Sequence, residues 1–370
     1  MSIDFLSLAV SDVQELAPYV PGKPMERETG LAAGEIIKLA SNETPLAVNP
    51  RIISAIEREL ENITRYPDGN GFRLKKKISD RLGLAPDGIT LGNGSNDLLI
   101  MIAQAFLTKG RNAVFGQHSF AVYASATAST GAERREIPGK DGGNDLDRML
   151  LAIDGDTRIV FVANPNNPTG TRFDRDALVR FLERVPAQTL VVLDEAYIEY
   201  ADDPSLPNGL DYVASHPNLI VCRSLCMAYG PAGLRVGYCA SSPQIADILN
   251  RVRQPFNVNS LALAGACAAI DDEKYLELGR EVNRQGRKQL QCGFTELGLN
   301  WIPSRTNFVS VDLGRPAAPI YEALLQKGVI VRPLAGYGMP DRLRISVGTQ
   351  FENARFLKVL SAILNEGVQE

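Results

Sequence analysis

Short apolar runs that alternate with longer amphipathic ones constrain the fold of this chain more than any other feature. Residues 173–185 keep the spacing of an amphipathic helix between two such runs. Strands that are buried on both faces and alternate with helices form a mostly parallel sheet, which helices cover on both sides. We therefore predict an α/β fold. The apolar runs cover residues 113–116, 158–163, 190–193, 219–222 and 236–240.

The last third of the chain predicts a second, smaller α+β unit. A long charged helical pattern at residues 272–296 is followed by short strand patterns that alternate with helical ones. We expect the N-terminal arm to pack with this unit. The predicted division is an arm and part of the small domain at residues 1–45, a large domain at 46–255 and a small C-terminal domain at 256–370.

Composition argues against several classes of protein. The net charge of −4 offers no basic surface for nucleic acid. No apolar run approaches the roughly 20 residues that span a bilayer, and the first residues do not resemble a signal peptide. The five cysteines are odd in number and lie mostly in apolar runs, which favours buried free thiols in a reducing cytoplasm.

Metal and serine-triad chemistry are also disfavoured. The chain has only two histidines, His118 and His216, and no Cys-x-x-Cys or His-x-x-His pair. We therefore expect no metal site. No Gly-x-Ser-x-Gly elbow is present to carry a nucleophilic serine.

Polar clusters follow three of the predicted strands. Residues 164–170 (Asn-Pro-Asn-Asn-Pro-Thr-Gly) follow one strand, Asp194 ends a second, and Ser224 begins the segment after a third. Because ligands bind at the carboxyl ends of strands in open α/β sheets, the clusters predict a single site. The alternative is that they are polar loops that merely cap the strands.

Three further features are ambiguous when each is taken alone. The glycine-containing turn at residues 92–97, in which Ser95 resembles an N-cap, suits a phosphate but also an ordinary capped turn. Arg235 begins an apolar strand, so it needs either a bound anion or a salt bridge. Asp194 closes an apolar run, where a carboxylate needs a cationic partner unless it caps a helix.

In their order and spacing, these segments resemble the fold-type I pyridoxal-phosphate aminotransferases, and most closely the histidinol-phosphate aminotransferase family. Each motif alone is weak to moderate, whereas the full set is specific and covers nearly the whole chain. The resemblance implies a large domain that binds pyridoxal 5'-phosphate. The segments that carry it are residues 18–24, 39–46, 65–68, 92–97, 164–170, 194–197, 230–238 and 343–348.

The resemblance assigns roles around the cofactor ring. Asp194 would pair with the protonated pyridine nitrogen and keep the ring an electron sink. Asn167 and Tyr197 would hydrogen-bond the ring hydroxyl oxygen. Phe120 would stack on the ring, although an ordinary core position would also explain it.

The resemblance also implies how the phosphate and the partner subunit are arranged. Gly94, Ser95, Ser224 and Arg235 would hold the phosphate. Tyr66 would reach the same phosphate from a second subunit, so a homodimer is expected.

The implied substrate is a small anionic molecule. Arg344 would bind its carboxylate or phosphate as a bidentate clamp. Tyr19, Asn42 and Arg332 are weaker substrate-side candidates. The family moves an amino group between glutamate or 2-oxoglutarate and histidinol phosphate, an imidazole-bearing phosphate ester of histidine biosynthesis.

One position departs from the family pattern in a way that bears on the chemistry. The resemblance places the Schiff-base lysine at Met227, eight residues before Arg235. A methionine can neither form an imine nor move a proton. No lysine lies between Lys140 and Lys274 to replace it from nearby in the sequence.

Met227 therefore predicts a transaminase that is impaired, with pyridoxal phosphate held non-covalently or absent. The alternatives are a non-catalytic protein that binds pyridoxal phosphate or another phosphorylated ligand, and a different reaction linked to pyridoxal phosphate. A deliberate replacement, a natural loss and an error in the sequence could each explain Met227. Cys226 and Pro231 also depart from the usual serine and leucine, and such clustered changes favour a natural loss.

Overall fold

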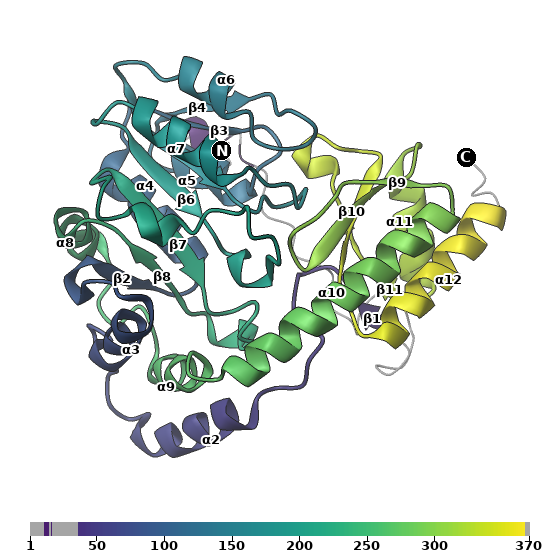
Figure 1. Ribbon diagram of the computed structural model, residues 1–370, viewed down its shortest axis with the longest axis horizontal. Coiled ribbons are helices and arrows are strands. Elements are labelled where there is room, and N and C mark those ends of the chain that lie inside the picture. Colours follow the sequence, from purple (N-terminus) through teal and green to yellow (C-terminus); the bar gives the residue numbers. More distant parts are fainter. Residues whose placement is uncertain (1–10, 15, 17–35, 367–370) are drawn as a thin grey trace, which may run out of the picture.

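The computed structural model describes residues 11–14, 16 and 36–366 of the chain. Figure 1 shows a larger body, built on a long sheet with helices on both faces, beside a smaller body that holds most of the C-terminal third. Tyr19 lies outside the described residues. The division at residues 45 and 255 remains our proposal, and residues 260–269, beyond its second boundary, pack with the larger body.

The larger body is built on a seven-stranded sheet with the strand order β2-β8-β7-β6-β5-β3-β4. β7, β6, β5, β3 and β4 run parallel to one another, and β8 is antiparallel to both β2 and β7. The predicted α/β fold with a mostly parallel sheet is therefore confirmed. The strands are β2 (Ile89–Gly92), β3 (Asn112–Gly116), β4 (Glu133–Ile137), β5 (Thr157–Ala163), β6 (Leu190–Asp194), β7 (Leu219–Ser224) and β8 (Gly237–Ala240).

Helices cover the two faces of this sheet with separate apolar clusters. On one face, Ile102 and Tyr123 pack against Phe161. On the other face, Phe181 packs against Val160 and its neighbours. The helices of this body are α2 (Pro50–Glu59), α3 (Phe72–Leu82), α4 (Ser95–Phe106), α5 (Ala121–Ala128), α6 (Leu146–Leu151), α7 (Arg175–Arg184), α8 (Pro243–Val252) and α9 (Ser260–Ala269).

The smaller body contains a four-stranded sheet, and a two-stranded sheet joins it to the N-terminal part of the chain. The four-stranded sheet has the order β12-β13-β10-β9. Strand β1 (Ile37–Lys38) pairs in parallel with β11 (Val329–Ile330), as expected for an arm that packs with this unit. The other elements of this body are β9 (Asn300–Trp301), β10 (Phe308–Asp312), α11 (Ala317–Gln326), β12 (Arg332–Pro333), β13 (Arg342–Ser346) and α12 (Gln350–Glu366). The short helix α1 (Ser11–Gln14) instead contacts α5 of the larger body.

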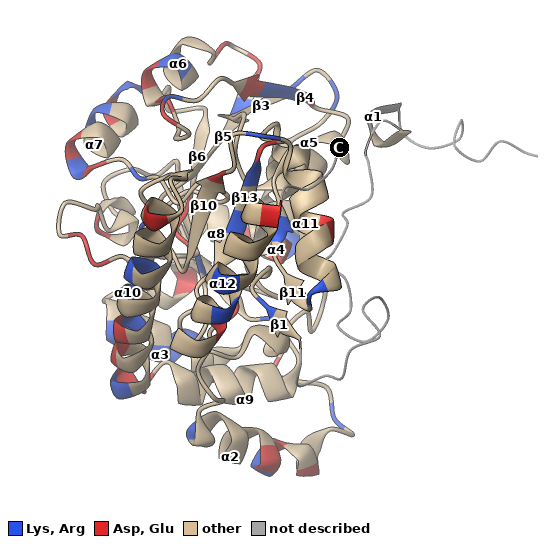
Figure 2. Ribbon diagram, turned by 90° about the vertical axis from the view of Figure 1, so that its right-hand side faces the viewer, with Lys and Arg blue, Asp and Glu red and all other residues tan. Residues whose placement is uncertain are grey.

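Helix α10 (Glu273–Glu296) is 24 residues long and connects the two bodies. It packs against β10 and α12 of the smaller body, and Arg280 Nε donates to the backbone oxygen of Glu199 in the larger body at 2.7 Å. Figure 2 shows acidic and basic residues intermixed along α10. In the part of the chain that the structure describes, no helix is long and apolar enough to cross a membrane.

Short 3-10 turns complete the connections. They are η3 (Leu60–Asn62), η4 (Pro86–Gly88), η5 (Ile198–Tyr200), η6 (Gly209–Tyr212), η7 (Ala232–Leu234) and η8 (Ala335–Tyr337).

Candidate active site

Three neighbouring strands of the large sheet end in polar residues at the same edge. Asp194 is the last residue of β6, Ser224 is the last residue of β7, and Asn164 follows β5 directly. Asp194 lies opposite Ala163 in the ladder, and its backbone oxygen accepts a hydrogen bond from the Asn164 N–H at 2.9 Å. The three polar clusters seen in the sequence therefore lie side by side.

A small cavity of about 40 Å³ opens at this edge. Since about 10–15 Å³ of this kind of volume holds one water, the cavity has room for only a few water molecules. Six residues that the sequence singled out line its wall: Ser95, Phe120, Asn167, Asp194, Tyr197 and Met227. Asn96, Ala163, Pro165 and Ala196 complete the lining.

Asp194 is a buried carboxylate whose partners are neutral. Its Oδ2 accepts from the Tyr123 hydroxyl at 2.7 Å, and its Oδ1 accepts from the Ala196 N–H at 3.1 Å. Burial raises the pKa of Asp194, although both hydrogen bonds oppose that shift. Within residues 36–366 no Lys, Arg or His forms an ion pair with Asp194. Because a buried charge is costly without a counter-charge, this wall of the cavity suits a cationic group.

Tyr197 provides a phenol at the opposite side of the same network. Its hydroxyl oxygen accepts from Asn42 Nδ2 at 2.8 Å and from Asn167 Nδ2 at 3.4 Å. Burial raises the pKa of Tyr197 to about 12. The hydroxyl therefore keeps its proton near neutral pH and can donate to a ligand oxygen.

The smaller body supplies a cation to this network. Arg344, on β13, donates from Nη1 to Asn167 Oδ1 at 2.5 Å and from Nη2 to the Ala40 backbone oxygen at 2.9 Å. Arg332, on β12, lies directly opposite Arg344 in the ladder. Arg344 is thus in contact with the cavity lining, and Arg332 lies one strand further away.

Arg235 and Gly94 form a possible anion subsite beside the cavity. Gly94 has a φ of +85° and precedes α4, so it takes the N-cap position that the sequence had suggested for Ser95. The guanidinium of Arg235 rests against Gly94 so closely that a Cβ there would lie 2.3 Å from Nη2. In the described ranges no carboxylate pairs with Arg235. A salt bridge therefore does not explain this arginine, whereas a bound anion would.

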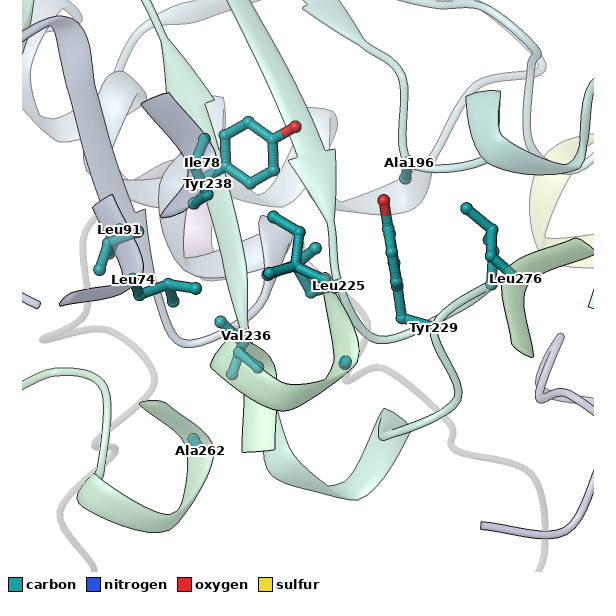
Figure 3. Packing of buried hydrophobic residues seen from close by; sticks show 14 of the residues in the cluster. Leu74, Ile78, Leu91, Ala196, Leu225, Tyr229, Val236, Tyr238, Ala262 and Leu276 are labelled. Atoms are coloured by element: carbon teal, nitrogen blue, oxygen red, sulfur yellow. The ribbon is translucent and has the colours of Figure 1, made fainter. Parts of the chain in front are cut away.

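The residues between β7 and β8 bring Cys226 and Met227 to this region. Cys226 Sγ lies 3.3 Å from Arg235 Nη1 and accepts from the Val236 N–H at 3.2 Å. Ser224 Oγ accepts from the Cys226 N–H at 3.1 Å. Buried side chains from both ends of the segment, among them Leu225 and Val236, join one apolar cluster (Figure 3). Met227 packs against that cluster, which fixes its place in the cavity wall.

No lysine of the described residues lines the cavity. Lys38, which is near the N-terminal arm, forms an ion pair with Glu43 at 2.9 Å. Lys23 belongs to the segment that the structure does not describe. Among the described residues, no lysine of the cavity wall could take over the role expected of a lysine at position 227.

Tyr66 does not reach the cavity of its own chain. Its side chain is 83% exposed and stacks on Phe256 with 4.7 Å between ring centroids. It lines a groove of about 650 Å³ formed by α2, α3 and α9. The expected role of Tyr66 in a second subunit therefore stays a prediction.

Two residues at the site had received no role in the sequence analysis. Tyr123 hydrogen-bonds Asp194, and Asn96 lines the cavity. The spacing of Phe120 and Tyr123 could have revealed the first, since residues three apart share one face of a helix. The polar character of residues 92–97 gave no means to separate Asn96 from its neighbours.

The family model for "Aminotransferase class I and II" matches residues 34–360. The chain therefore belongs to the class I and II aminotransferases, as the resemblance predicted. It is 60% identical over 364 residues to histidinol-phosphate aminotransferase 2 of Pseudomonas aeruginosa, a match that covers 98% of this chain and 99% of that protein. It is 55% identical over 370 residues to histidinol-phosphate aminotransferase of Stutzerimonas stutzeri, which covers 99% of this chain and 100% of that protein.

A solved structure shows the same fold over nearly the whole length. The crystal structure of histidinol-phosphate aminotransferase from Sinorhizobium meliloti in complex with pyridoxal-5'-phosphate superposes with a TM-score of 0.87. It is 29% identical and covers 96% of each chain.

Proposed function

We propose that this protein keeps the cofactor and substrate sites of a histidinol-phosphate aminotransferase but is severely impaired in amino transfer. The observation that carries the proposal is the cavity wall, where Met227 takes the place expected for the lysine among otherwise suitable residues. Loss of a nucleophile and base costs several orders of magnitude in other enzymes.

The residues present fit pyridoxal phosphate. Asp194 offers a buried carboxylate to a protonated ring nitrogen, and Phe120 offers an aromatic face. Arg235 and the first N–H groups of α4 suit a phosphate. Because the cavity is about 40 Å³, a ring could enter only if lining side chains shift, and the flexible side chain of Met227 can do so.

When bound, the cofactor would supply an electron sink for bonds at the substrate's amine-bearing carbon. The protein's own contribution would be to orient both molecules. Tyr197 would donate its hydroxyl proton to the ring hydroxyl oxygen, with Asn42 and Asn167 fixing its position. Met227 stands where the family's lysine would accept the proton from the substrate carbon, and its side chain cannot do so.

The residues proposed to bind the substrate favour a small anion. Arg344 already contacts Asn167, so a carboxylate or phosphate bound to it would lie next to the cofactor residues. The names of the relatives support histidinol phosphate, with glutamate or 2-oxoglutarate as the amino-group partner. We propose Arg332, Asn42 and Tyr19 as supporting contacts.

A homodimer is proposed from the exposed surface around Tyr66. The groove beside it holds arginine, lysine and carboxylate side chains around an apolar floor. A second copy would cover these groups and bring its own Tyr66 towards the phosphate subsite. A cytoplasmic location is also proposed, because all five cysteines fall in the described residues and none forms a disulfide.

A second candidate function is ligand binding without turnover. The buried carboxylate of Asp194 and the neighbouring Arg235 would hold a phosphorylated pyridine even if no chemistry followed. Stable binding of pyridoxal phosphate by a protein that remains inactive after Met227 is replaced by lysine would favour this candidate.

The test starts with incubation in pyridoxal phosphate, reduction with borohydride and mass spectrometry of the digest. The unmodified sequence should give no pyridoxyl-lysine in the cavity, whereas Met227→Lys should give one at residue 227. Met227→Lys should also restore amino transfer from glutamate. Met227→Leu is the matched control without an amine. A pyridoxyl-lysine from another cavity residue of the unmodified protein would contradict the proposal.

A further inference from the structure

Tyr123 is a fully buried tyrosine directly behind the cavity. It lies on α5, three residues after Phe120, and its hydroxyl donates to Asp194 Oδ2 at 2.7 Å. Phe120 and Asp194 both line the cavity, whereas Tyr123 does not. Tyr123 therefore touches two cavity residues from their rear side.

Three aromatic rings fix the orientation of Tyr123. It stacks on Phe161 with 4.9 Å between centroids and 5° between planes. Phe120 meets it edge-on at 6.0 Å and 90°, and Phe115 meets it at 6.3 Å and 60°. A ring packed in this way cannot turn its hydroxyl away from Asp194 without disturbing the core.

We propose that Tyr123 is a positioning residue that keeps the Asp194 carboxylate ionised and directed at the cavity, so that the site selects a ligand with a protonated ring nitrogen. The selection of such a ligand rests on the proposed function. The contact with Asp194 does not.

The protonation states support a permanent donor. Burial and the nearby Asp194 raise the pKa of Tyr123 well above its usual value, so its hydroxyl stays protonated. Burial also raises the pKa of Asp194, and the Tyr123 hydrogen bond is the largest influence that lowers it. Of the other groups facing Asp194, the Ala196 N–H also lowers its pKa and the Glu195 carboxylate raises it, while Cys222 on β7 is a buried thiol.

The first test uses the protein without added ligand. A carboxyl whose folded pKa exceeds its unfolded value loses folding stability as pH rises between the two values. Removing the Tyr123 hydroxyl raises the folded pKa of Asp194 further, so the destabilisation by Tyr123→Phe should grow as pH rises above the folded pKa of Asp194 in the unmodified protein. Urea unfolding at fixed protein concentration measures it. In an Asp194→Asn background the pH dependence of the Tyr123→Phe effect should disappear.

The second test uses pyridoxamine phosphate and its analogue with C–H in place of the ring nitrogen. Loss of a hydrogen bond to a charged group should weaken binding of pyridoxamine phosphate by about 10- to 100-fold in Tyr123→Phe. Binding of the analogue should change by less than about 3-fold. Tyr238→Phe, which removes a hydroxyl from another buried tyrosine on β8, is the matched control and should leave both affinities unchanged.

The outcomes separate the two proposals. A Tyr123→Phe effect that is independent of pH and equal in both Asp194 backgrounds would show that Tyr123 only fills space, which overturns the inference. Equal weakening of both ligands would do the same. If the unmodified protein binds neither ligand, the proposed function fails, and the unfolding experiment still decides whether Tyr123 controls Asp194.

Discussion

Replacing Arg223 by methionine should destabilise this protein strongly, because it strands a buried carboxylate beside the candidate site. Arg223 Nε and Nη2 donate to Glu195 Oε2 at 3.0 and 2.7 Å. The exposed fractions of the two side chains are 9% and 0%. Breaking a buried ion pair by removing one partner costs about 3–5 kcal/mol, since the remaining charge has no counter-charge. We expect Arg223→Met to fall in that range.

The pH dependence of the loss identifies its cause. Burial raises the pKa of Glu195, and Arg223 is the main influence that lowers it. Without Arg223, folded Glu195 should keep its proton to higher pH than the unfolded chain does. The destabilisation should therefore be smallest at low pH, where Glu195 is protonated with or without Arg223, and grow as pH rises above the folded pKa of Glu195 in the unmodified protein, by the linkage between proton binding and folding.

Urea unfolding at constant protein concentration and several pH values is the assay. The control is Arg223→Met combined with Glu195→Gln, which removes the charge as well as its partner. The double variant should be more stable than Arg223→Met alone at pH 8. A double variant that is equally unstable would refute the reasoning, because the loss would then come from packing or from the contacts of Arg223 with Asn208 and Glu199.

Three other expectations concern different parts of the molecule. Gly237→Ala should lower the free energy of unfolding in urea by about 1–3 kcal/mol and weaken phosphate binding, since its Cβ would lie 2.7 Å from the Ser95 backbone nitrogen. The control is Gly233→Ala, which has open space around its Cβ and should leave the stability unchanged. Burial raises the pKa of Glu199 to about 7, so the folding stability should fall as pH rises from 4.5 to 7. Glu199→Gln should remove on the order of 3 kcal/mol of that fall. An unchanged dependence of stability on pH would contradict this prediction. Ile63→Asp, at a 59% exposed position near the Tyr66 groove, should raise the dimer dissociation constant by about 10- to 100-fold in sedimentation equilibrium. An unchanged dissociation constant would place the interface elsewhere.

The strands buried on both faces were the part of the fold that the sequence made predictable. Residues 158–163 and 190–193 are apolar at every or nearly every position, and both became central strands, β5 and β6. Strand β4 was not predicted because it is an edge strand with the sequence ERREI, whose exposed charges carry no apolar signal. Strand β2 was also missed, since its four residues are too few to show a period.

The site residues that could be predicted from the sequence are polar residues at or just after the ends of apolar strands. Asp194 and Asn167 fit that rule, and the structure brings them to one cavity. For Tyr123 the three-residue spacing from Phe120 was the only available signal, because a buried tyrosine in an apolar helix looks like core until its hydroxyl partner is known. The role proposed for Tyr66 could not be tested in the same way, since a contact across an interface needs a second copy of the chain, and within one chain Tyr66 stacks on Phe256.

Contacts between the two bodies hold several residues of the cavity wall and its surroundings in place. Arg344 bonds to Asn167, Asn42 to Tyr197, and Ser310 Oγ to the Pro168 backbone oxygen at 2.5 Å. All three bonds cross from the arm or the smaller body to the larger one, so separating the bodies breaks them together. Because Arg344 and Asn42 belong to the smaller body and the arm, while Asn167 and Tyr197 belong to the larger body, the shape of the cavity wall depends on how tightly the two bodies are held together.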